Sequence, residues 1–312
     1  MASPNRVKAN LVRSLIEIGG LPIIIAAGVA VVVNVDANYG RTVEFNSDGN
    51  VAVIILGGAA LAFFAMTGFE NAANVAEETH NPSKAFPLAL IGGMITAGVL
   101  YVLVALSTSL IVGVDKIADS AGALLVVVEE GPLAVPAKVF AAIALVAVTN
   151  TCLVAIVTQS RILYGMARED VVPRGFARIH RTRRTPWVGI IFSAVVIVGL
   201  LLSPADIVRL ASVTVVFTLF IYGLVIVAAL KLRSEPVEHE HFTAPTFLLY
   251  VGILGNAGLL FYVIRDDPAS LIYCAALLAV GLLLYVLNRF TAGRTHHTAN
   301  PPVDSPTDNE SR

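Results

Sequence analysis

Residues 63–87 read FFAMTGFENAANVAEETHNPSKAFP and place an acidic side chain, Glu70, inside an apolar run. A charge within a membrane-spanning segment is expensive, so it marks a candidate functional site. Thr67 and Gly68 stand just before this acid. Glycine weakens a helix, and a break here would free backbone groups to meet a ligand. The stretch therefore predicts non-helical backbone between Ala65 and Gly68 with helix on both sides. The alternative is an unbroken helix with Glu70 near the cytoplasmic interface.

The composition indicates a membrane protein. Of the 312 residues, 56% are hydrophobic and 14% are charged, whereas soluble domains carry about 25% charged residues. The charges gather in short clusters between apolar runs of roughly 20 residues, the length that crosses a bilayer core. The sequence therefore predicts an all-α membrane protein with about eight transmembrane helices. These helices are expected near residues 12–33, 51–74, 88–112, 137–163, 186–203, 206–230, 246–264 and 269–289.

Lysine and arginine are distributed unevenly between the two sides of the predicted helices. With the N-terminus inside, most of them fall in cytoplasmic loops, above all in the basic loop 168–184, whereas Arg41, Lys116 and Arg265 fall outside. Positive charge in short loops marks the cytoplasmic side of a membrane protein. Both termini are therefore predicted to be cytoplasmic, in the cell membrane. The preference of positive charge for cytoplasmic loops also explains the basic loop better than nucleic-acid binding does. The net charge of −1 gives no indication of a nucleic-acid partner.

The sequence also predicts the structure of two segments outside the predicted spans. Residues 291–312 are rich in Pro, Thr, Asn and Asp and lack apolar periodicity, so they are predicted to be disordered. The domain prediction is thus a membrane domain over 1–290 followed by a cytoplasmic tail. In the outer segment that follows residue 113, Ala123 to Val128 is predicted to form a short amphipathic helix lying on the protein.

No cofactor and no metal site is predicted. Cys152 and Cys274 fall inside apolar runs, where a thiol behaves as a small apolar group. Glu77 and Glu78 are adjacent, but no third ligand follows at regular spacing. A solvated loop cluster is therefore favoured over a metal or acid–base site.

Three stretches resemble the amino acid–polyamine–organocation (APC) permease superfamily. GFENAANVAEETHNPSKAFPLAL, from Gly68, is similar to the signature of the family's sixth helix. SRILYGMARED over 160–170, followed by Pro173 and Phe176, resembles the end of helix eight and the loop after it. The start of the chain, NRVKAN from Asn5, is more weakly similar to the start of helix five.

The resemblance implies a partial LeuT-type helical bundle in which residues 1–290 correspond to family helices five to twelve. It also implies secondary active transport of amino acids or related amines. The expected partners are such a substrate, the lipid bilayer, protons as a candidate coupling ion, and the N-terminal half that the family has and this chain does not match. Two alternatives remain open: a truncated, transport-inactive permease fragment or half-subunit, and a membrane-embedded enzyme. The enzyme is disfavoured because the sequence has no intramembrane His/Asp cluster and no Asp-rich loop.

The resemblance also assigns site residues. Phe64 matches an aromatic gate over the substrate, and Glu70 matches an acid linked to gating or proton sensing. Some proton-coupled members carry a lysine near the position of Glu17; here an acid stands instead, so the lysine mechanism does not carry over. Glu17 is a candidate for proton coupling or gating, because burial raises the pKa of a carboxyl toward neutral pH. The favoured alternative is a simple helix pair with Arg13. The broken backbone of the sixth helix is matched by Ala65, Met66, Thr67 and Gly68.

A polar stripe supplies the remaining candidates. Thr214, Thr218 and Tyr222 recur every four residues, so they share one face of a helix. Thr214 and Thr218 are predicted to line the substrate path. The alternative for each residue is that its hydroxyl bonds the carbonyl of residue i−4 or joins two helices together.

Overall fold

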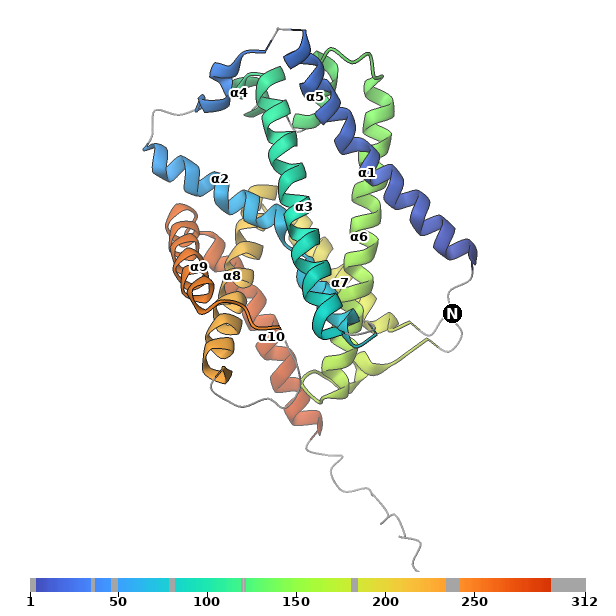
Figure 1. The fold of residues 1–312 in the computed structure, drawn as a ribbon. Helices are drawn as coiled ribbons and strands as arrows, with labels where there is room; N and C mark the ends of the chain where they lie inside the picture. The colour runs from blue at the N-terminus through green and yellow to red at the C-terminus, as the bar shows by residue number, and fades with distance from the viewer. Residues whose placement is uncertain are drawn as a thin grey trace, which may run out of the picture. The chain divides into compact units, whose positions relative to one another are not determined.

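The computed structural model describes residues 4–34, 37–45, 50–78, 82–118, 120, 122–180, 185–233 and 242–292. These residues form helices joined by turns, without any strand (Figure 1). The long helices are α1 (Pro4–Val33), α2 (Val51–Met66), α3 (Pro82–Ile111), α6 (Ala137–Arg168), α7 (Trp187–Leu201), α8 (Ile207–Leu232), α9 (Thr246–Asp266) and α10 (Ser270–Ala292). The short ones are α4 (Val114–Ala118), α5 (Ala123–Glu130) and the 3₁₀ helices η1 (Tyr39–Val43), η2 (Phe69–Glu78) and η3 (Arg174–Ala177).

Each predicted span coincides with a long helix. Within the described part of the chain, 6 segments are long and apolar enough to cross a bilayer, namely α2 with the start of η2, and α3, α6, α8, α9 and α10. Between 0% and 22% of the residues in their apolar windows are buried inside the chain, as expected for side chains that face lipid. Of the two other long helices, α7 is shorter, with an apolar stretch over Trp187–Leu201, and in α1 the described side chains give an apolar stretch over Gly19–Val33. The chain is thus an all-α, multi-pass membrane protein.

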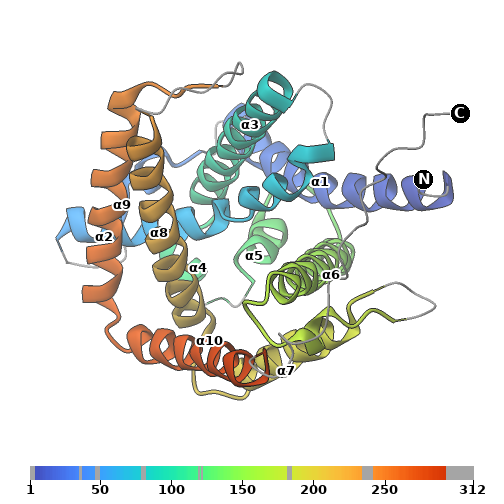
Figure 2. The ribbon, with the colours of Figure 1, turned by 90° about the horizontal axis from the view of Figure 1, so that it is seen from below.

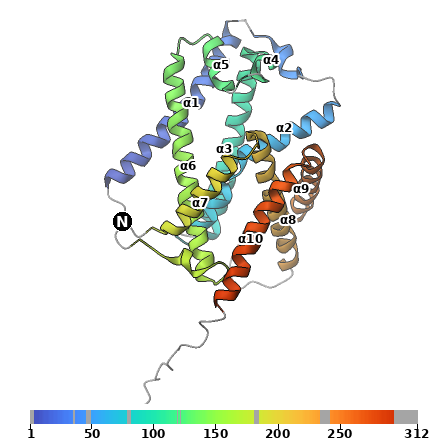
Figure 3. The ribbon, with the colours of Figure 1, turned by 180° about the vertical axis from the view of Figure 1, so that it is seen from behind.

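The chain divides into two compact units, residues 1–155 with 203–274 and residues 156–202 with 275–312. In the first unit, α1 crosses α3 closely, and α4 and α5 lie at one end of this pair (Figures 1 and 3). Gly28 of α1 faces Ser107 of α3, where an added Cβ would lie 2.2 Å from the serine Oγ. The core around this crossing consists of Ile24, Ala27, Val31, Ile111, Val112, Val127, Val128 and Phe140.

The amphipathic helix predicted at Ala123–Val128 is confirmed as α5. Its residues Val127 and Val128 are buried against α1 and α3. The loop after α1 adds a polar contact, because Arg41 Nη1 donates to the carbonyl oxygen of Ile111 at 3.2 Å. That carbonyl is at the C-terminal end of α3, where helices leave backbone acceptors unpaired. The loop after α1 is therefore hydrogen-bonded to the C-terminal end of α3.

Also within the first unit, α8 and α9 lie side by side (Figures 1 and 2), and both contact α2. The carboxylate of Asp206 caps α8 by accepting from the backbone N–H of Arg209 at 2.9 Å. The Arg209 guanidinium in turn pairs with Asp267, just after α9, at 3.2 Å. An arginine in the first turn of a membrane helix is thus held by a carboxylate at that end.

In the second unit, the family-like stretch 160–170 builds the end of α6. Asp170 has a positive φ of 56°, and the N–H of Val171 donates to the carbonyl of Met166 at 2.9 Å, as in a Schellman helix end. The Asp170 carboxylate pairs with Arg174 at 2.7 Å and raises the pKa of that guanidinium. The Asn288 amide of α10 donates to the Asp170 carbonyl. The small core beside this turn contains Leu163, Ala167, Val172 and Phe176.

Candidate functional site: the break between α2 and η2

The helix that carries Glu70 is interrupted where the sequence predicts it. The α-helical backbone ends at Met66, and Thr67 is extended, with φ −68° and ψ 159°. Gly68 follows with φ +108°, a conformation that side chains rarely permit. The chain then resumes at Phe69 as a 3₁₀ helix rather than an α-helix. The prediction of non-helical backbone flanked by helix is confirmed.

The break exposes backbone groups, and neighbouring side chains satisfy several of them. The hydroxyl of Thr67 donates to the carbonyl of Phe64 at 2.7 Å. The Tyr101 hydroxyl, from α3, donates to the carbonyl of Ala65 at 3.1 Å. A carboxylate oxygen of Glu70 accepts from the N–H of Gly68 at 2.8 Å. These bonds satisfy backbone groups that the interruption leaves without helical partners.

Glu70 also joins the break to α8. Its Oε2 accepts a second hydrogen bond, from the Tyr222 hydroxyl, at 2.9 Å. Two aromatic rings flank that tyrosine, with centroid distances of 5.9 Å to Phe63 and 5.6 Å to Phe69. Tyr222 and Glu70 thus connect the start of η2 to α8.

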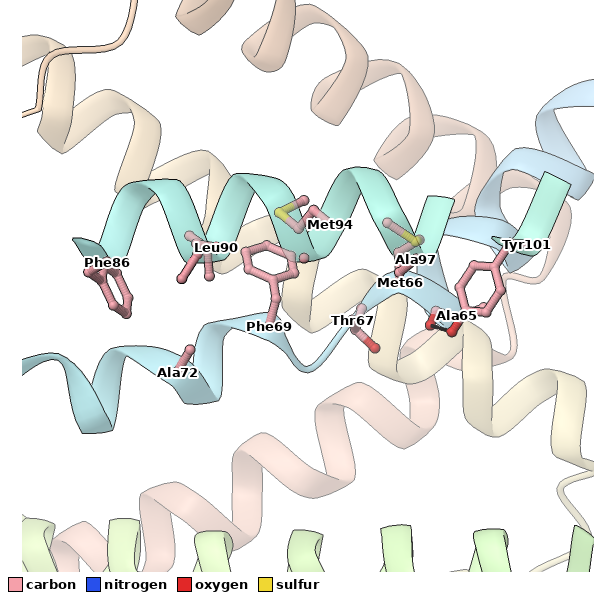
Figure 4. A pocket seen from close by; sticks show the side chains of 12 residues that line it. Ala65, Met66, Thr67, Phe69, Ala72, Phe86, Leu90, Met94, Ala97 and Tyr101 are labelled. Carbon is pink, nitrogen blue, oxygen red and sulfur yellow. Dashed lines mark hydrogen bonds between the residues drawn. The ribbon is translucent and has the colours of Figure 1, made fainter. Parts of the chain in front are cut away.

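A cavity of about 360 Å³ lies beside the break, between α2–η2 and α3 (Figure 4). Figure 4 shows the Phe69 ring directed from η2 toward α3, and the Tyr101–Ala65 hydrogen bond at one end of the cavity. Aromatic, thioether and small side chains predominate in the lining. It consists of Ala65, Met66, Thr67, Phe69, Ala72, Phe86, Ala89, Leu90, Gly93, Met94, Ala97 and Tyr101.

Of the residues that the sequence predicts for the substrate site, some line the cavity and others do not. Ala65, Met66 and Thr67 line the cavity, whereas Phe64 and Gly68 do not. The Phe64 side chain is 37% exposed. For Glu17, the structure describes the backbone within α1 but not the side chain.

The polar stripe on α8 is not part of this cavity. Neither Thr214 nor Thr218 lines it. The Thr214 hydroxyl donates to the carbonyl of Leu210 at 3.0 Å, which is the i−4 bond given above as the alternative. Only Tyr222, the third member of the stripe, reaches the break, through Glu70.

Sequence reasoning missed the residues that α3 contributes. Phe86, Leu90, Gly93, Ala97 and Tyr101 follow one another at intervals of three or four, so they share one helix face. That spacing was visible in the sequence. In a helix that is apolar on all sides, however, periodicity does not show which face meets a neighbouring helix.

Comparisons with known proteins agree with this architecture. The family model for amino acid permeases matches residues 7–301. A branched-chain amino acid permease of Bacillus subtilis is 28% identical over 237 residues, which cover 75% of this chain and 50% of that protein. A methylthioribose transporter of the same organism is 25% identical over 231 residues, covering 73% of this chain and 49% of that protein.

The chain is also similar to a transporter from another organism. Cationic amino acid transporter 5 of Arabidopsis thaliana is 33% identical over 176 residues, covering 56% of this chain and 30% of that protein. The chain spans about half the length of the two bacterial relatives. Its match to the family model extends over nearly all of its own length. The chain therefore belongs to the amino acid permease family, within the APC superfamily.

Proposed function

We propose that the chain takes part in secondary active transport of amino acids or related amines across the cell membrane, with the substrate bound at the break between α2 and η2. The observation that carries the proposal is the interruption at Thr67 and Gly68 in a membrane helix, next to an acid and a cavity. Discontinuous helices form the substrate sites of many transporters, because their free ends meet charged groups. The relatives are named for branched-chain amino acids, cationic amino acids and methylthioribose. Their names support small-molecule transport and leave the substrate class open.

The proposed roles follow from the two helix ends at the break. The carbonyls at the C-terminal end of α2 carry partial negative charge, which favours a substrate ammonium. The N–H groups at the start of η2 favour a carboxylate. Ala65, Met66 and Thr67 would contact the substrate, and Gly68 would permit the backbone turn. Glu70 would act in gating or proton coupling, because its carboxylate joins the break to α8.

Substrate binding should depend on the face of α2 that lines the cavity. Ala65→Trp is expected to weaken amino-acid binding by at least about tenfold, or ~1.4 kcal/mol, because the indole would fill the cavity. Ala62→Trp, on the same helix but exposed and outside the cavity lining, is the matched control and should bind normally. The measurement is equilibrium binding of a panel of labelled amino acids to the purified chain in lipid nanodiscs, up to millimolar concentrations. Absence of saturable binding by the unmodified chain, or equal loss in both variants, would contradict the proposal.

We propose in addition that both termini face the cytoplasm, in accordance with the distribution of Lys and Arg. In a chain without its native cysteines, Cys152 and Cys274, a membrane-impermeant maleimide should label Lys116→Cys in intact cells. It should label Arg178→Cys only after permeabilisation. Both positions are exposed in the structure, so access by the reagent is not limited by packing. The reverse labelling pattern would refute this orientation.

A further inference from the structure

The described residues that line the cavity beside the break include no charged side chain. Met66, Phe69, Phe86, Leu90 and Met94 supply its larger apolar surfaces. Ala72, Ala89, Gly93 and Ala97 supply small ones, which leave the space open. Ligand sites are typically apolar, with a few placed polar groups, and their volumes begin at about 300 Å³. A cavity of about 360 Å³ is therefore at the small end of that range.

The polar side chains in the lining are already engaged as donors. The Tyr101 hydroxyl donates to Ala65 and the Thr67 hydroxyl donates to Phe64. The acid closest along the chain, Glu70, is outside the lining and accepts from Gly68 and Tyr222. Among the side chains that the structure describes, none that lines the cavity would offer a carboxylate to a positively charged group. Such a group is costly to bury unless it is paired.

We infer that this cavity receives the side chain of the substrate and selects aliphatic and thioether side chains over cationic ones. The inference rests on the proposed function, and it adds the substrate class. In Figure 4, Phe69, Leu90 and Met94 lie between the polar end of the cavity, at Ala65 and Tyr101, and its apolar end, at Phe86. The two methionine side chains can adjust to branched or unbranched chains, because thioethers are flexible and polarisable.

The glycines of α3 provide a matched pair of variants. A Cβ added at Gly93 or at Gly92 would meet no atom within 4 Å, so a new side chain can begin at either position without a clash. Gly93 lines the cavity and Gly92 does not. Leucine also favours a helix more than glycine does. Gly93→Leu should therefore fill the cavity. Gly92→Leu adds the same side chain to the same helix at a position outside the cavity lining.

The test is equilibrium binding of labelled L-leucine, L-methionine and L-lysine to the purified full chain in nanodiscs. The unmodified chain and Gly92→Leu should bind leucine and methionine at least about tenfold more tightly than lysine. Gly93→Leu should lose that preference, and Gly93→Ala should shift it toward smaller side chains such as that of L-alanine. A purely structural defect would not change the ranking of ligands by size.

The contrary outcomes are distinguishable. Binding of lysine as tight as that of leucine would overturn the inference while leaving amino-acid binding intact. Unchanged leucine binding by Gly93→Leu would overturn it as well, and loss of a co-purifying lipid from that variant would assign the cavity to an acyl chain instead. If none of these amino acids binds the unmodified chain, the proposed function fails first and the inference fails with it.

Discussion

Replacing Gly28 by valine is expected to destabilise the first unit by about 3 kcal/mol or more, because overpacking a tight contact forces the backbone to move. The Cβ alone would lie 2.2 Å from Oγ, 2.4 Å from Cβ and 2.8 Å from Cα of Ser107. The last of these atoms is backbone, so a change of the serine rotamer cannot relieve the contact. The helices α1 and α3 would have to separate, which opens the core around Ile24 and Val112.

Gly19→Val is the control for Gly28→Val. It puts the same side chain in the same helix, at a position where an added Cβ meets nothing within 4 Å. The readout is thermal unfolding in detergent, followed by a thiol-reactive dye on the buried Cys274 after removal of the exposed Cys152. In the double variant Gly28→Ala with Ser107→Gly, the two closest contacts disappear, so partial recovery over Gly28→Ala is expected. Equal stability of Gly28→Val and Gly19→Val would show that the two helices do not cross closely at this glycine.

The sequence was sufficient to predict the long helices and the position of the break. Apolar runs of membrane-spanning length place helices directly, because the bilayer requires internal hydrogen bonding of every spanning segment. Thr67 and Gly68 before Glu70 likewise predict an interruption of the helix. Glycine destabilises a helix, and a charge within a membrane span is costly. For α7 the same reasoning was less accurate. Its 15 helical residues extend about 22 Å, which is less than a bilayer core of about 30 Å.

The partners of the break could not be predicted from the sequence. Tyr101 and Tyr222 reach Ala65 and Glu70 from separate helices, 36 and 152 residues away in the chain. Such contacts depend on how whole helices pack, and a uniformly apolar helix does not reveal which face will be covered. For Thr214 the sequence left two interpretations open. Its place on a polar stripe suggested the substrate path, but its hydroxyl bonds within its own helix.

Gly68→Val is expected to remove amino-acid binding and to destabilise the chain by about 2–3 kcal/mol. At φ +108° a β-branched residue is severely strained. The strain is relieved if the backbone returns to a negative φ and the helix continues from α2 into η2. In a continuous α-helix the Ala65 carbonyl would accept from the N–H of Phe69. It would then no longer need the Tyr101 hydroxyl, and the free backbone groups proposed to meet the substrate would be consumed by the helix.

The control for Gly68→Val is Gly58→Val, within the regular part of α2, where an added Cβ also meets nothing within 4 Å. Valine is more favourable than glycine inside a helix, so Gly58→Val should be neutral or slightly stabilising. Three measurements distinguish the variants: thermal unfolding, binding of labelled amino acids, and hydrogen exchange of the amides between residues 66 and 70. Closure of the break should slow exchange at Phe69 and Glu70 while binding is lost. If Gly68→Val unfolds at the same temperature as Gly58→Val and keeps its exchange rates and its binding, then the positive φ of Gly68 is not needed for the break. The substrate site would then have to be sought elsewhere in the chain.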